Sequence, residues 1–230
     1  KYIGENKKIF IIAEIGINHG GNFKKCIKMI NAAARSGADS VKIQTNDVNE
    51  SYAPRTASYK EFKFKNFSDK ELLKLKRYSE SLGVIFFSSP GDIKSLKRLI
   101  RIKIPVIKIS SGLATNLPLI GEVIRRKIPI IISTGFSDKK DLDDLKKFIN
   151  KFNFRKIAIL KCTSIYPASS SELDLNSIKF LKEKFNLPVG YSDHSMGDLA
   201  TVVAVSCGAT IIEKHFTLNK LQKGADHKIS

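Results

Sequence analysis

The chain has 230 residues, of which 42% are hydrophobic and 27% charged, and its formal net charge is +18. A chain of this size can bury one sizeable core, and none of its apolar runs is long enough to span a bilayer. The chain has three cysteines, Cys26, Cys162 and Cys207. They show no C-x-x-C spacing, which argues against a disulfide framework or a zinc knuckle. Unpaired cysteines fit a reducing compartment, so we expect a cytoplasmic protein.

The positive charge admits three explanations: nucleic-acid binding, attraction of an anionic substrate, or a lysine-rich surface that keeps the protein soluble. The lysines are spread through every predicted helix, and aromatic residues are not interleaved with them as nucleic-acid binding would require. We therefore favour a solubilising surface first and an anionic substrate second. No nucleic-acid or membrane partner is expected.

Eight short apolar runs rich in β-branched residues recur along the chain, and each ends in polar or charged residues. Lysine-rich segments with helical periodicity separate these runs. One of them is Ser68–Leu82, in which Ser68 and Glu71 form a capping box. Its apolar positions predict a buried helix face made of Leu72, Leu73, Leu75 and Tyr78. The predicted strands are Ile9–Ile15, Asp39–Thr45, Val84–Ser88, Val106–Ser110, Ile128–Ser133, Ile157–Cys162, Leu187–Tyr191 and Thr210–Lys214. Alternating strands and helices predict a single α/β domain over residues 1–230, a (β/α)8 TIM barrel.

The end of the chain departs from this repeat. Thr217–Ser230 is polar and lacks an apolar period, so the last helix of the barrel is missing from the prediction and apolar surface should be exposed near it. We expect the sequence to be a fragment of a longer protein. The longest predicted loop, Asn46–Asn66, is a candidate substrate-covering loop because of four side chains, Tyr52, Arg55, Tyr59 and Lys60.

Function in this fold is sought at the C-terminal ends of the strands. Glu14 stands there before a glycine-flexed loop and could act as a general acid or base, or it could pair with an interior lysine. Lys42 and Lys108 lie within buried strands and need negative partners. The two lysines would form a ring of donors suited to phosphate or carboxylate, together with the hydroxyls at Ser88-Ser89, Ser110-Ser111, Ser133-Thr134, Thr163-Ser164 and Ser192. The alternative is that both lysines only make structural ion pairs.

Two histidines, His194 and His215, follow the ends of adjacent predicted strands. Neighbouring strands lie about 4.8 Å apart, so the imidazoles could converge on a catalytic divalent metal; the alternative is that each only forms hydrogen bonds. His19 and His227 are weaker candidates, which could orient substrate or be solvated. Asp226 follows the last strand and could bind substrate hydroxyls.

Taken in order, these strand-end motifs resemble the sialic acid synthase family, which includes the pseudaminic and legionaminic acid synthases. The matching motifs are Ala13-Glu14-Ile15-Gly16-x-Asn18-His19-x-Gly21, Lys42-x-Gln44, Ser88-Ser89-Pro90, Lys108-Ile109-x-Ser111-Gly112, Ser133-Thr134-Gly135, Cys162-Thr163-Ser164-x-Tyr166-Pro167, Gly190-Tyr191-Ser192-Asp193-His194-Ser195, Glu213-Lys214-His215-Phe216 and Gly224-x-Asp226-His227. They span nearly the whole chain.

The resemblance implies an enzyme that condenses phosphoenolpyruvate with an N-acetyl amino sugar to give a nine-carbon sugar acid and phosphate. It implies that Glu14 is the acid/base residue and that His194 and His215 bind Mn²⁺ or Mg²⁺. Residues implied to bind phosphoenolpyruvate are Lys42, Ser89, Lys108, Ser111, Ser133, Ser164 and Ser192, and those implied to face the sugar are Gln44, Tyr166 and Asp226. A homodimer is implied for the full-length form, whose C-terminal antifreeze-like domain is expected to be absent from this chain.

Two positions depart from the family pattern: Leu113 stands where an acidic residue is common, and Lys161 where histidine is common. Two other functions stay open. A Schiff-base aldolase would use Lys42 or Lys108 as its amine nucleophile. A non-catalytic barrel would bind polyanions through its lysine-covered helices.

Overall fold

The computed structural model describes residues 3–4, 6–224 and 226–230. Its eight strands are hydrogen-bonded in chain order as a closed barrel and alternate with helices, which confirms the TIM-barrel fold class. The strands are β1 (Phe10–Gly16), β2 (Ser40–Thr45), β3 (Ile85–Pro90), β4 (Ile107–Ile109), β5 (Ile130–Ser133), β6 (Ile157–Cys162), β7 (Val189–Asp193) and β8 (Ile211–His215). Every predicted strand is present, with ends displaced by at most about two residues.

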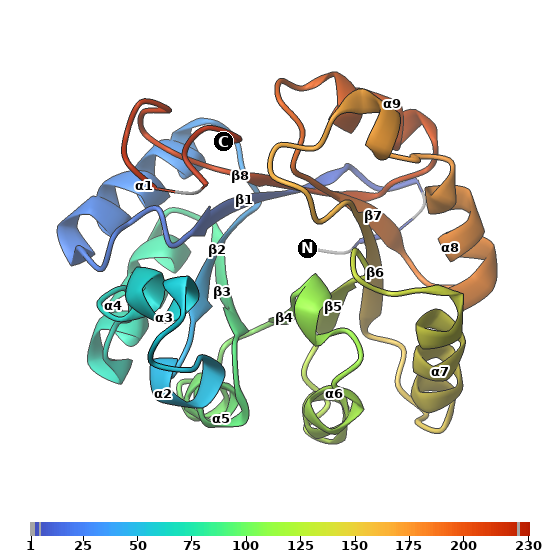
Figure 1. The fold of residues 1–230 in the computed structure, drawn as a ribbon, viewed down its shortest axis with the longest axis horizontal. Coiled ribbons are helices and arrows are strands. Elements are labelled where there is room, and N and C mark those ends of the chain that lie inside the picture. Colours follow the sequence, from blue (N-terminus) through green and yellow to red (C-terminus); the bar gives the residue numbers. More distant parts are fainter. Residues whose placement is uncertain (1–2, 5, 225) are drawn as a thin grey trace. The chain divides into compact units, whose positions relative to one another are not determined.

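The chain divides into two compact units. The N-terminal unit consists mainly of Ile12–Ile107 and His215–Lys228. Its helices are α1 (Phe23–Arg35), α2 (Val48–Ser51), α3 (Ala57–Phe62), α4 (Asp69–Ser81) and α5 (Ile93–Arg101). Within this unit α4 and α5 pack against β3, and α1 packs against β2 and α4 (Figure 1).

The C-terminal unit consists mainly of Lys108–Lys214. It contains the short 3₁₀ helices η1 (Ser111–Leu113) and η2 (Ser170–Glu172), and the α-helices α6 (Leu117–Arg125), α7 (Lys139–Asn150), α8 (Ser177–Phe185) and α9 (Leu199–Ser206). Helix α8 packs against β6 and β7, and α9 packs against β7. Helix α9 also exposes apolar side chains, with Leu199 74% and Val202 61% exposed.

Local chemistry accounts for the helix starts that the sequence predicted. Ser68 caps α4 in the predicted capping box with Glu71. Leu72 and Leu75 of its predicted apolar face are fully buried, whereas Leu73 and Tyr78 are only half-buried. The third buried residue of the helix is Ser79, whose hydroxyl donates a hydrogen bond to the carbonyl of Val84 at 2.8 Å.

The segment 46–66 is not the continuous loop that the sequence predicted, because it folds into α2 and α3. Asp47 and Thr56 cap these helices through their side chains, a signal that short helices provide only weakly. The residues 216–224 and 226–230 contain no helix or strand, as predicted. Among the described residues, no helix combines the length and apolar content needed to cross a lipid bilayer.

Candidate functional site

A buried ion pair joins β1 and β2 in the N-terminal unit. The Nζ atom of Lys42 lies 2.8 Å from Oε2 of Glu14, and both side chains are at most 4% exposed. The same Nζ donates to Oγ of Ser89 at 3.1 Å. Strand register explains the meeting, because Glu14 is opposite Lys42 across β1 and β2, and Gln44 is opposite Ser89 across β2 and β3. Lys42 has therefore found the negative partner that its burial demands.

A glycine lets the chain's last segment approach this pair. Gly16 has a φ of +55°, and a Cβ added to it would lie 3.3 Å from Oδ2 of Asp226 and 3.4 Å from Oε1 of Glu14. The same position would lie 3.7 Å from Cε1 of His215, whose Nδ1 is 3.6 Å from Oδ2 of Asp226. Glu14, His215 and Asp226 are thus neighbours within the N-terminal unit.

The C-terminal unit contains a second buried cluster of the same three residue types. Lys108 Nζ lies 3.2 Å from Oε1 of Glu213, and Ser192 donates its hydroxyl to the same oxygen at 2.9 Å. All three side chains are buried. Sequence reasoning gave Glu213 no role of its own, although its spacing of two residues from His215 on a strand already placed both side chains on one face.

Hydroxyl groups from consecutive strand ends converge beside Gly135. Its backbone N–H donates to Oγ of Ser111 at 3.0 Å, and an added Cβ would come within 2.3 Å of Oγ of Ser164. Only a residue without a side chain leaves this space open. Ser133, two residues earlier, is 1% exposed, and its hydroxyl has no hydrogen-bond partner among the described residues. Such a buried hydroxyl is suited to an anionic ligand.

His194 is held in one orientation. Its Nδ1 donates to the backbone carbonyl of Thr163 at 2.7 Å and lies 3.7 Å from Sγ of Cys162. The ring stacks against Tyr166 with centroids 4.0 Å apart. Burial disfavours the charged imidazole, but Cys162 and the Thr163 carbonyl outweigh burial and raise the pKa of His194. The sequence did not predict the contact between His194 and Cys162, because the two residues come from different strands.

The donor chemistry of both candidate metal ligands fits a divalent ion. With Nδ1 of His194 bonded to a carbonyl, Nε2 is the ring nitrogen suited to ligation, and His215 stands beside a carboxylate as metal-binding histidines commonly do. Among the described residues no group of three or more His, Cys, Asp or Glu side chains is arranged to hold a metal. His194 belongs to the C-terminal unit and His215 to the N-terminal unit, so their joint ligation stays a prediction.

The remaining candidates differ in their surroundings. Gln44 is half-buried on β2, and Tyr166 is 51% exposed. His19 is fully buried and His227 is 2% exposed, so the interpretation of either as a solvated side chain is wrong. His19 accepts a hydrogen bond from the Gly21 N–H at 2.9 Å, and burial, with Lys25 and Lys65, lowers its pKa to about 3.

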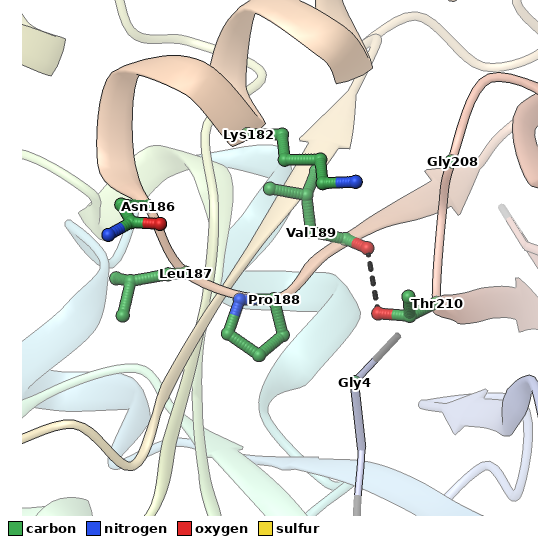
Figure 2. A pocket seen from close by; sticks show the side chains of 8 residues that line it. All are labelled: Gly4, Lys182, Asn186, Leu187, Pro188, Val189, Gly208 and Thr210. Carbon is green, nitrogen blue, oxygen red and sulfur yellow. Dashed lines mark hydrogen bonds between the residues drawn. The ribbon is translucent and has the colours of Figure 1, made fainter. Parts of the chain in front are cut away.

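A cavity of about 260 Å³ lies away from these clusters, at the N-terminal ends of β7 and β8 within the C-terminal unit. Figure 2 shows its lining, where the Thr210 hydroxyl donates to the Val189 carbonyl at 3.0 Å. The candidate site residues of the same strands, Ser192 and Glu213, stand near their C-terminal ends. This cavity is therefore not the candidate functional site.

Fold and strand-end clusters together are typical of a TIM-barrel enzyme. A sequence model of the NeuB family matches residues 29–230, and the chain belongs to this family. An uncharacterised protein of Methanocaldococcus jannaschii is 40% identical over all of this chain and 68% of its own length. The N,N'-diacetyllegionaminic acid synthase of Legionella pneumophila is 36% identical over 99% of this chain and 69% of its own length.

A solved structure, the N-acetylneuraminic acid synthetase of Leptospira borgpetersenii in complex with citrate, superimposes with a TM-score of 0.95. It is 34% identical, and the match covers 99% of this chain and 80% of that one. The resemblance to the sialic acid synthase family is therefore confirmed. These matched enzymes are sugar-acid synthases by name.

Proposed function

We propose that this chain condenses phosphoenolpyruvate with an N-acetyl amino sugar, forming a nine-carbon sialic-acid-type sugar acid and phosphate. Membership of a family whose named relatives are sugar-acid synthases supports the reaction class. The observation that carries the proposal is the pair of buried clusters, Glu14–Lys42–Ser89 and Glu213–Lys108–Ser192. A buried ammonium group beside a hydroxyl is suited to a carboxylate or a phosphate group.

Binding of phosphoenolpyruvate is assigned to the two lysines and the serine hydroxyls. Lys42 and Lys108 supply positive charge in surroundings that exclude water, where an ionic contact is stronger than at the surface. The anion is oriented by the hydroxyls of Ser89, Ser111, Ser133, Ser164 and Ser192. The space beside Gly135 would admit a ligand oxygen between Ser111 and Ser164.

In the proposed reaction, the methylene carbon of phosphoenolpyruvate forms a bond to the aldehyde carbon of the open-chain sugar, the π bond of the aldehyde breaks, and the aldehyde oxygen takes up a proton to become a hydroxyl. Positive charge then develops at the neighbouring carbon, water adds there, and the C–O bond to phosphate breaks. Glu14 stabilises that charge and accepts a proton from the attacking water. A bound Mn²⁺ or Mg²⁺, held by His194 and His215, would supply Lewis-acid polarisation of the aldehyde.

Orientation of the sugar is assigned to Gln44, Tyr166 and Asp226. Asp226 is supported by its closeness to Glu14 and His215 around Gly16. A carboxylate at that position can accept hydrogen bonds from sugar hydroxyls. Holding the two substrates together removes much of the entropic barrier to their condensation.

Phosphate release tests the proposal. The purified chain is incubated with phosphoenolpyruvate, Mn²⁺ and one of three acceptors: N-acetylmannosamine, its 6-phosphate, or a diacetamido trideoxy hexose. We expect phosphate release that requires one of the acceptors, together with a product of matching mass. A folded chain that releases no phosphate with any of them would contradict the proposed reaction.

The aldolase alternative makes the opposite demand on the lysines. A Schiff base forms from a neutral amine, whereas the carboxylates of Glu14 and Glu213 favour the ammonium form of Lys42 and Lys108. We expect borohydride with pyruvate to label neither lysine. Labelling of either residue would favour the aldolase.

A further inference from the structure

Adjacent residues on β7 and β8 form cross-strand pairs on opposite faces of the sheet. Register places Ser192 opposite Glu213 and Asp193 opposite Lys214. Because side chains alternate along a strand, the first pair shares the face of the candidate site and the second pair faces away from it. Lys214 Nζ lies 2.6 Å from Oδ2 of Asp193, whose side chain is fully buried.

This second pair also binds Ser195, the residue that follows His194. Oδ1 of Asp193 accepts hydrogen bonds from the N–H of Ser195 at 2.8 Å and from its hydroxyl at 2.7 Å. Lys214 Nζ donates to the carbonyl of Ser195 at 2.8 Å. Tyr191 donates its hydroxyl to the same carboxylate at 3.1 Å. Backbone groups immediately after His194 are thus fixed by two charged side chains.

The backbone of His194 itself is held from the other direction. Its carbonyl accepts a hydrogen bond from the N–H of Ala168 at 3.0 Å, and Ala168 and Ser195 form an isolated parallel bridge. With the main chain restrained at residues 193, 194 and 195, the imidazole reaches the Thr163 carbonyl at 2.7 Å. That hydrogen bond selects the tautomer with the proton on Nδ1.

A buried ion pair contributes little net stability compared with apolar residues of similar size, so its value can lie in the geometry that it enforces. Within the part of the chain that the structure describes, the side-chain hydrogen bonds of the pair end on β7, β8 or Ser195. We propose that Asp193 and Lys214 are positioning residues for His194, which they hold so that its imidazole presents Nε2 in one tautomer and one orientation. The role goes beyond the proposed function, and only its metal readout rests on that function.

The test compares the parent chain with a double variant, Asp193→Asn with Lys214→Met, that removes both charges and keeps an acceptor for Ser195. Lys214→Met alone would leave a buried carboxylate without its cation and lower Tm by roughly 10 °C, so the double variant is the informative one. The single variant Asp193→Asn, which removes only the carboxylate of the pair, is measured in the same way. The matched control is Lys184→Met, which removes the ion pair between Lys184 and Asp143 in the same unit.

The first readout needs neither metal nor substrate. In ¹⁵N-histidine-labelled protein, at a pH high enough for the His194 imidazole to be neutral, ¹H–¹⁵N spectra report the tautomer of each ring, and a His194→Gln variant identifies the His194 signals. We expect one Nδ1–H tautomer in the parent and in Lys184→Met, and a tautomer mixture in the double variant. A folded double variant with His194 still entirely in the Nδ1–H form would overturn the proposal.

The second readout is the affinity for Mn²⁺, measured by titration. Loss of groups that orient a ligating histidine typically weakens metal binding about 10- to 100-fold, and we expect a loss of that size in the double variant but not in Lys184→Met. Equal Mn²⁺ affinity in the parent and the double variant would count against the positioning role. If the parent binds no Mn²⁺ while the tautomer shift is present, the positioning role stands and the metal part of the proposed function fails.

Discussion

The two buried clusters of the candidate site share their residue types but differ in how the serine is used. In the N-terminal unit, Ser89 accepts a hydrogen bond from Lys42, whose Nζ also lies 2.8 Å from Glu14. In the C-terminal unit, Ser192 donates to Glu213, so one carboxylate oxygen receives both the serine and Lys108. Oε1 of Glu213 thus faces two donors, whereas Glu14 faces the ammonium group of Lys42.

Glu14 instead stands beside Asp226 and His215 around Gly16. When two carboxyl groups lie near each other, the negative charge of one stabilises the protonated form of the other. Such a pair is suited to exchanging a proton. In the proposed mechanism Glu14 is therefore the residue expected to transfer the proton, and Glu213 the residue expected to balance the charge of Lys108.

The largest expected effect separates these two carboxylates. Glu14→Gln should lower kcat by about 10²- to 10⁴-fold, the range for removal of a general acid or base, while phosphoenolpyruvate affinity stays near the parent value. Glu213→Gln should instead act mainly on phosphoenolpyruvate affinity. Steady-state kinetics and substrate titration of both variants test the distinction, and normal turnover in Glu14→Gln would remove Glu14 from the mechanism.

Stability should separate the two lysines. Lys42→Met leaves Glu14 buried without its cation and should lower the free energy of unfolding by about 3–5 kcal/mol. Lys108→Met should lie at the lower end of that range, because Ser192 still donates to Glu213. Urea unfolding measures both. Lys94→Met, which removes the exposed Asp47–Lys94 pair, should change little, and a similar loss in all three variants would contradict the account.

A pH-dependent effect on stability is expected in the N-terminal unit, through His19. Its pKa is lowered from the ordinary 6.5 to about 3, so the unfolded chain binds a proton that the folded chain does not. The contribution of His19 to the free energy of unfolding is fully present above about pH 6.5. It is lost as the pH falls, by at most about 1.4 kcal/mol per pH unit. Urea unfolding at pH 7 and pH 5 should show a smaller pH difference in His19→Asn; an unchanged difference would exclude His19 as its source.

The smallest expected effect concerns the space beside Gly135. A methyl group there meets the hydroxyls of Ser164 and Ser111, so Gly135→Ala should weaken phosphoenolpyruvate binding by about tenfold, or 1.4 kcal/mol. Gly112→Ala is the matched control, since an added Cβ at Gly112 meets nothing within 4 Å. Equal affinities for the two variants in calorimetric titration would remove this space from the binding site.

Sequence patterns predicted the parts of the molecule that depend on local periodicity and on strand order. Eight apolar runs were enough for eight strands, and the capping box at Ser68 marked the start of α4. Lys42 and Lys108, charged residues within buried strands, pointed to carboxylate partners that the structure contains. In each case the signal lies within a few neighbouring residues.

Contacts between residues distant in the chain could not be read in the same way. The identity of the partner of Lys108 depends on β4 and β8, which are about 100 residues apart, and the approach of Asp226 to Glu14 depends on the path of the final segment. The sequence left open whether His19, which stands beside glycine in a predicted loop, orients substrate or is solvated, yet the ring of Phe67 lies 4.5 Å from its own. Burial of that kind is decided by tertiary packing.

The most direct test of the central claim is calorimetric titration of the chain with phosphoenolpyruvate, with and without Mn²⁺, beside a His194→Ala, His215→Ala double variant. We predict that the parent binds phosphoenolpyruvate more tightly with Mn²⁺ and that the double variant loses this enhancement. A chain shown to be folded that binds no phosphoenolpyruvate under either condition would contradict the account.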